Sequence, residues 1–133
     1  MVTRLVGRGG PDAHPVDVLT AVLPTDDESI ENWRFSMSVR AAGLFDPELL
    51  RFDRQVAEYW AGYLPARLAG LVAVDADEAA DHLLVALDGV AVRAIADPDA
   101  WPATRQITHL ERAFASLDPI GTEARTGQET ETP

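Results

Sequence analysis

The chain has 133 residues, 47% hydrophobic and 25% charged, a composition that suits a single globular domain with its own core. Its formal net charge of −11 makes contact with nucleic-acid phosphates or with an anionic membrane surface unfavourable. Cysteine is absent, which excludes disulfides and thiolate metal sites, and no apolar run has the length of a signal peptide or a membrane span, so we expect a cytoplasmic protein without membrane contact.

Both ends of the chain differ in composition from its middle. Residues 1–15 hold three Gly and two Pro among few large apolar residues, which predicts a loose leader. Residues 119–133 are polar and rich in Thr and Glu, which predicts a disordered tail. Residues 16–118 are therefore expected to form one compact unit, and they contain no internal repeat.

Helix-start and helix-stop signals divide this unit into five predicted helices. Pro15 precedes a short apolar run that Pro24 ends. Thr25 and Glu28 have the spacing of a capping box, and they predict the start of a second helix. Its apolar residues recur at three- and four-residue spacing as far as Leu44 and form a broad stripe, which is typical of a central helix.

The remaining three helices have equally clear starts. Asp46-Pro47 starts the third, which is expected to run to about Val72. Asp75 caps the fourth, over residues 77–96, and Pro102 starts the last one. No alternating pattern predicts a strand. The expected fold class is all-α, a bundle of about five helices, and the short link between the last two predicts an antiparallel pair.

Few residues suggest catalysis or metal binding. Glu78 and His82 are four apart on a predicted helix, but a di-iron bundle needs a repeated Glu-x-x-His pair that the sequence lacks. Acids in a first turn more ordinarily complement the helix dipole. His14 and His109 stand alone, and neither a phosphate-binding loop nor a nucleophile elbow is present. We predict no catalytic residue, metal or cofactor, and a protein that is not an enzyme.

Aromatic residues gather on the second and third predicted helices. Such a stripe is more often filled core than a binding surface. Two Tyr hydroxyls need partners if they are buried, and apolar walls with a few polar groups also describe a small-molecule cavity. We predict a cavity for a small ligand with Arg40 or a hydroxyl supplying polarity, and a filled core is the alternative. The predicted lining residues are Trp33, Met37, Arg40, Phe52, Tyr59 and Tyr63.

The segment LLVALDGVAVRAIADPDAWPATR, residues 83–105, resembles a signature segment of TetR-family transcriptional regulators. Many members carry a Leu-rich helix with Asp-Gly-Leu-Ala-x-Arg, then Asp-Pro and a last helix. Residues 23–60, LPTDDESIENWRFSMSVRAAGLFDPELLRFDRQVAEYW, are also similar to that family's pattern of an acidic helix start, an aromatic-rich helix and Asp-Pro-x-Leu. The resemblance covers about residues 16–118.

The resemblance implies that the last two helices of each of two subunits form a four-helix dimer interface. Gly89 would then let a neighbouring helix approach closely. Asp88 would pair with a basic group such as Arg93, or with the partner subunit, and the alternative is a helix edge that faces water. The implied interface residues are Leu84, Asp88, Gly89, Val92, Ile107, Leu110 and Phe114.

One departure from the family limits what the resemblance implies. Family members begin with a basic three-helix DNA-binding region, and nothing similar precedes Val16. We therefore expect the effector-binding and dimerisation half of a TetR-like repressor, a homodimer that binds a small apolar or aromatic effector and does not contact DNA by itself. The alternative is a standalone helical interaction protein that heterodimerises with a full-length regulator and modulates it.

Overall fold

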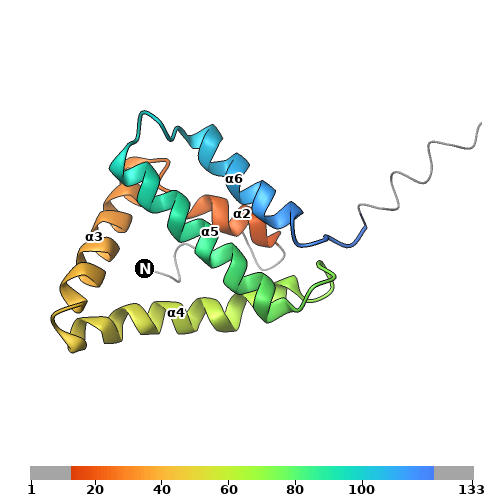
Figure 1. The fold of residues 1–133 in the computed structure, drawn as a ribbon, viewed down its shortest axis with the longest axis horizontal. Helices are drawn as coiled ribbons and strands as arrows, with labels where there is room; N and C mark the ends of the chain where they lie inside the picture. The colour runs from red at the N-terminus through yellow and green to blue at the C-terminus, as the bar shows by residue number, and fades with distance from the viewer. Residues whose placement is uncertain (1–12, 122–133) are drawn as a thin grey trace, which may run out of the picture.

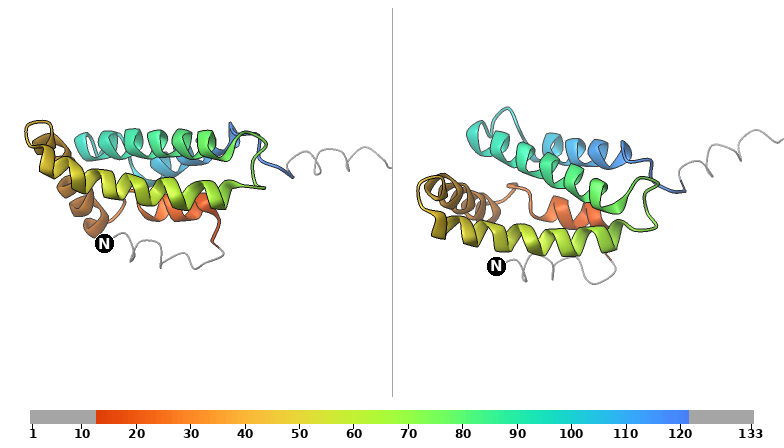
Figure 2. Two further views of the ribbon diagram at one scale, coloured as in Figure 1. Left: turned by 90° about the horizontal axis from the view of Figure 1, so that it is seen from below. Right: turned by 60° about the horizontal axis from the view of Figure 1, so that its bottom comes forward.

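The computed structural model describes residues 13–121, and within them the chain folds into helices in two layers (Figures 1 and 2). No strand occurs in this range, where an isolated bridge joins Val72 to Pro119. The prediction of an all-α bundle of five helices is confirmed. The helices are α2 (Pro15–Ala21), α3 (Asp27–Gly43), α4 (Pro47–Leu68), α5 (Ala76–Ala96) and α6 (Ala103–Ala115).

Most of the predicted leader and tail, residues 1–12 and 122–133, lies outside the described range. Backbone hydrogen bonds hold the chain where the predicted tail, residues 119–133, begins. Ala73 N donates to Asp118 O at 3.1 Å, and Ile120 N donates to Leu71 O at 2.8 Å. These bonds hold residues 118–120 against the connection between α4 and α5. No helix in residues 13–121 is both long and apolar enough to cross a membrane.

The start of α3 uses a different pair from the predicted Thr25 and Glu28. Asp26 is the N-cap, and its Oδ1 accepts a hydrogen bond from Ser29 N at 2.7 Å. Ser29 Oγ accepts in return from Asp26 N at 3.1 Å, which completes a capping box. Both pairs have the same three-residue spacing, so the pattern placed the motif one residue too early.

The other boundaries follow the sequence closely. Asp75 Oδ2 accepts from the N–H groups of Asp77 and Glu78, both at 3.1 Å, and so caps α5 as predicted. α4 ends at Leu68, before the predicted end at Val72, because Gly70 adopts a left-handed φ of 82° that a helix cannot continue through.

The core lies between α2, the second half of α4, α5 and α6. Its largest fully buried side chains include Leu19 of α2, Leu64 of α4, Leu83 of α5 and Leu110 of α6. α3 contributes little, since Phe35 is 55% exposed. The prediction that this helix is central is therefore wrong.

The arrangement of the helices leaves two features for function. α3, α4 and α5 form the sides of a triangle (Figure 1), and α3 buries only Ser29 and Gly43 in this arrangement. α5 and α6 form one layer, and the other helices cover its inner face only (Figure 2). Among the helices of residues 13–121, none therefore covers the outer face of α5 and α6.

Candidate ligand site

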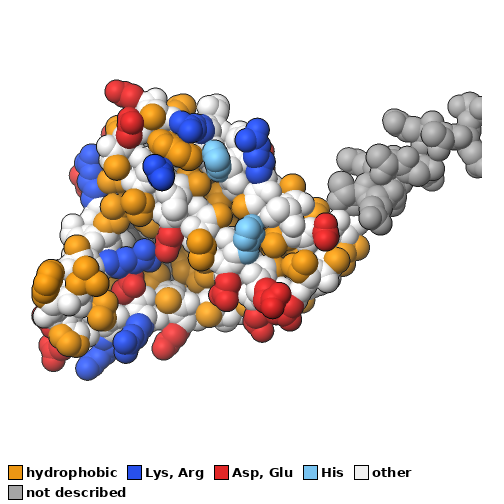
Figure 3. Space-filling view, in the orientation of Figure 1, with side chains coloured by type: hydrophobic (Ala, Val, Ile, Leu, Met, Phe, Trp, Pro, Cys, Tyr) orange, Lys and Arg blue, Asp and Glu red, His pale blue; other side chains and the backbone are white. Residues whose placement is uncertain are grey.

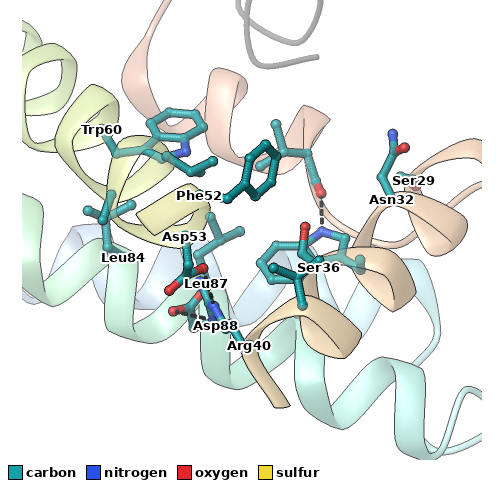
Figure 4. A pocket seen from close by; sticks show the side chains of 15 residues that line it. Ser29, Asn32, Ser36, Arg40, Phe52, Asp53, Trp60, Leu84, Leu87 and Asp88 are labelled. Carbon is teal, nitrogen blue, oxygen red and sulfur yellow. Dashed lines mark hydrogen bonds and ion pairs between the residues drawn. The ribbon is translucent and has the colours of Figure 1, made fainter. Parts of the chain in front are cut away.

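A cavity of about 230 Å³ lies between α3, α4 and α5 (Figure 4). Its volume corresponds to about eight water molecules in the liquid. α4 and α5 supply an apolar wall that includes Phe52, Trp60 and Leu84. α3 supplies polar groups at helical spacing, so that they share one side of the helix. These polar residues of α3 are Ser29, Asn32, Ser36 and Arg40.

A charged cluster joins the three helices at the cavity. Arg40 Nε donates to Asp53 Oδ1 at 2.7 Å, and Arg40 Nη1 donates to Asp88 Oδ2 at 3.2 Å. The side chains of Arg40, Asp53 and Asp88 are 39%, 30% and 45% exposed, so water reaches all three. Ion pairs this exposed stabilise a fold by only about 0–1 kcal/mol. The cluster therefore matters more for the charge of the cavity than for stability.

Two members of this cluster have shifted pKa values. Burial raises the pKa of Asp88, the nearby Arg40 opposes that change, and the neighbouring Asp53 carboxylate adds to it. Burial lowers the pKa of Arg40, but its bond to Asp53 and the field of both carboxylates outweigh this, and the net shift is upward. Arg40 therefore stays cationic, while Asp88 takes up a proton more readily than an ordinary aspartate.

We expect Asp88 to give the free energy of unfolding a specific pH dependence. In the unfolded chain it titrates near its ordinary value of 3.8, and in the folded protein its pKa is higher. Between these two values the folded state binds more protons, so the free energy of unfolding falls as pH rises and is level above the folded pKa. Urea unfolding of wild type and Asp88→Asn, between about pH 3 and 7, measures this difference. If the free energy of unfolding of the wild type, relative to that of Asp88→Asn, instead rose with pH, the ion pair with Arg40 would outweigh the effect of burial on Asp88.

Three of the six predicted ligand residues lie on the cavity. Trp33, Arg40 and Phe52 line it. Trp33 Nε1 donates to Val22 O at 2.6 Å, which fixes the indole ring against the α2–α3 connection. Met37 is not among the lining residues. The polar face of α3, which the sequence reading left out, lines the cavity instead.

Tyr59 and Tyr63 do not line the cavity. Their rings stack on each other, 5.9 Å apart and 10° from parallel. The Trp60 ring meets both of them edge-on at 5.8 and 5.9 Å, and Trp60 is the last residue of α4 that lines the cavity. The Tyr63 hydroxyl is buried without a hydrogen-bond partner among residues 13–121. The predicted placement of the two tyrosines in the cavity is therefore corrected, because neither of them lines it.

Three of the predicted interface residues face inward. Leu84 and Asp88 line the cavity, and Asp88 pairs with Arg40 of α3 rather than with Arg93. Leu110 is only 1% exposed and belongs to the core of its own chain. Leu110 is corrected because its own chain encloses it. Leu84 and Asp88 are only partly buried, and they are corrected because they face the cavity rather than the outer face.

Gly89 and Val92 face outward, as an interface requires. A Cβ at Gly89 would meet no atom of its own chain within 4 Å. Val85, one turn earlier, is 73% exposed. Ile107 and Phe114 are half-buried against the core, and the Phe114 ring packs edge-on against His14 at 4.9 Å. A shallow groove on this outer face is lined by His82, Gly89, Arg93, Trp101, His109 and Arg112, among others.

Metal chemistry gains no support from the described residues. No group of three or more His, Asp and Glu side chains there could hold a metal ion. His82 Nε2 lies 3.2 Å from the Ser116 hydroxyl, and no third candidate ligand joins Glu78 and His82 in residues 13–121.

These features define an all-α domain with a ligand-sized cavity among three helices and a bare helix pair on its outer side. Residues 12–119 match the family model of the C-terminal domain of BetI-type transcriptional repressors. The chain belongs to this family, and thereby to the C-terminal domains of TetR-family regulators.

A solved structure supports the same fold. The crystal structure of a transcriptional regulator from Rhodococcus sp. Rha1 superposes with a TM-score of 0.75 at 23% sequence identity. The alignment covers 87% of this chain and 66% of that one, so the chain spans about two thirds of the regulator's length. Comparison with curated proteins gives no match.

Proposed function

We propose that this domain binds a small effector and dimerises as part of a TetR-like repressor system. The observation that carries the proposal is the cavity between α3, α4 and α5. A ligand there touches three helices at once, and one of them, α5, also carries the outward-facing Gly89. Occupancy of the cavity would therefore favour one position of α5 over another and so change the geometry of a dimer.

The proposed effector is small and mainly apolar or aromatic. The cavity volume of about 230 Å³ lies below the usual range for drug-sized ligands, so one ring with a short substituent fits best. Trp33, Phe52 and Trp60 offer aromatic surface, while Arg40 and the hydroxyls of α3 offer hydrogen bonds. This combination orients a ligand that has one apolar and one polar end.

The proposed dimer uses the outer face of α5 and α6, which no other helix of the described range covers. Acidic side chains gather over the start of α5 and again over the connection that follows it, and Arg and His side chains lie over α6 and between these two acidic groups (Figure 3). A two-fold axis near Gly89 would place the acidic start of one α5, with Asp81, opposite Arg93 in the last turn of the partner's α5. The apolar centre, with Val85 and Val92, would then be buried between two complementary charged regions.

DNA contact is not part of the proposed role of residues 13–121. The net charge of the chain, −11, opposes contact with DNA phosphates. We propose that the domain binds the effector and forms the dimer in the cytoplasm, and that another part of the repressor system recognises DNA.

A thermal-shift screen of the full chain with single-ring aromatic compounds tests the cavity. A compound at one hundred times its dissociation constant should stabilise the fold by about 2.7 kcal/mol. Tryptophan fluorescence should change in parallel, because Trp33 and Trp60 line the cavity. Failure of a broad panel to change either signal would remove the effector-binding role and leave the dimer proposal to stand alone.

A further inference from the structure

The polar end of the cavity is electrically unbalanced. Of its lining residues one is cationic, Arg40, and two are anionic, Asp53 and Asp88, so the net charge is negative at neutral pH. Arg40 binds one oxygen of each carboxylate. The second oxygens, Asp53 Oδ2 and Asp88 Oδ1, accept no hydrogen bond from residues 13–121. Both carboxylates therefore keep an acceptor that water or a ligand must satisfy.

The two carboxylates also lie close enough to affect each other. Figure 4 shows Asp53 and Asp88 side by side next to Arg40, at one end of the cavity. Burial is the largest cause of the upward pKa shift of Asp88, Arg40 opposes it, and the Asp53 carboxylate makes the smallest contribution. Because one cation faces two carboxylates, a second positive group at this point would balance the remaining charge.

We propose that the effector is a compact arylalkyl amine, whose protonated N–H groups bind the free oxygens of Asp53 and Asp88 while its ring lies among Phe52, Trp60 and Leu84. This inference rests on the proposed effector-binding role of the cavity. The ammonium ion supplies the missing charge, and it supplies N–H donors for both acceptors. Its apolar part matches the wall that α4 and α5 provide, and the small cavity limits that part to one ring.

Other ligand chemistries fit this end of the cavity less well. An anionic ligand would gain Arg40 but meet two carboxylates, so it would raise the negative charge further. A neutral aromatic ligand would fill the apolar part and leave the two carboxylate oxygens to water. A quaternary ammonium ion has the right charge but no N–H to donate, so it cannot satisfy either oxygen.

Isothermal titration calorimetry on the full chain tests this inference with three matched compounds. They are 2-phenylethylamine, 2-phenylethanol and trimethyl(2-phenylethyl)ammonium. We expect the amine to bind about tenfold or more tightly than the alcohol, as charge-assisted hydrogen bonds predict. The trimethylated compound should bind more weakly than the amine.

Two variants and a pH series sharpen the test. Asp88→Asn should remove most of the preference for the amine, and Asp99→Asn, at an exposed position outside the cavity, should leave it unchanged. The affinity of the wild type for the amine should fall as pH falls through the pKa of Asp88, because a proton then replaces the ligand cation. Asp88→Asn should flatten this dependence.

Each contrary result has a distinct meaning. Equal binding of amine and alcohol would overturn the amine assignment and leave the cavity as an effector site. Tighter binding of the trimethylated compound would overturn the role of the N–H groups. Absence of binding by all three compounds would overturn the assignment, and only failure of the wider aromatic panel would overturn the proposed function as well.

Discussion

Gly89→Leu is expected to turn a dimer into a monomer without harming the fold of the single chain. Gly89 lies in the middle of α5 on the bare outer face, and a Cβ there meets nothing of its own chain within 4 Å. Leu is a better helix former than Gly, so each chain should gain about 0.5–1 kcal/mol of stability. In the proposed two-fold contact the same side chain meets the partner twice, and overpacking costs about 1–3 kcal/mol at each copy.

Sedimentation equilibrium at micromolar concentration measures this effect. The wild type should have twice the 14.4 kDa mass of one chain, and Gly89→Leu should have that mass once, with a dissociation constant raised about 100-fold or more. Gly62→Leu is the matched control, because Gly62 is also inside a helix and also has nothing within 4 Å, but lies on α4. It should gain stability and stay dimeric. A dimeric Gly89→Leu would move the interface away from α5, and a monomeric wild type would remove the dimer altogether.

Ser36→Phe is expected to abolish effector binding while the domain stays folded. Ser36 lines the cavity from the polar side of α3 and is only partly buried (Figure 4). A phenyl ring in its place would occupy much of the cavity of about 230 Å³ and contact Phe52 and Trp60 across it. The ligand then loses its space, whereas the protein gains apolar contacts.

Thermal unfolding with and without a ligand from the screen measures this effect. Saturating ligand should raise the melting temperature of the wild type by roughly 10 °C, and that of Ser36→Phe by nothing measurable. Ser38→Phe is the matched control, because Ser38 lies on the same helix but is exposed and does not line the cavity. It should respond to ligand as the wild type does. A Ser36→Phe variant that still responds fully would place the ligand elsewhere.

The Asp88-Gly89 pair joins the two proposed activities in one helix. Asp88 faces the cavity and holds Arg40, and the next residue faces the outside. Consecutive positions on a helix differ by about 100° in direction, so a rotation of α5 that moves one of them moves the other. If the proposed ligand shifts Asp88, the outer face of α5 turns with it. In this proposal the carboxylate serves the cavity and the glycine serves the dimer contact.

The amino-acid sequence by itself determined the fold class and most helix boundaries. Asp46-Pro47, Asp75 and Pro102 act on neighbouring backbone groups, and the helices do start at or next to these residues. The order of the helices and the Asp-Pro and Asp-Gly signatures also led to the correct family, which the family model confirms over residues 12–119. These properties are local, so they can be read from residues close together in the chain.

Only the tertiary structure decided which side of each helix meets which neighbour. α3 has an apolar stripe that suggested a central helix, yet its polar side faces the cavity and Phe35 is exposed. Asp88 forms its ion pair with Arg40, 48 residues away in the chain, rather than with the nearby Arg93. Tyr59 and Tyr63 do not line the cavity, and Leu110 is enclosed by its own chain. Helical periodicity fixes which residues share a side, but the contacts of that side depend on how separate helices pack, and this is decided by burial summed over the whole domain.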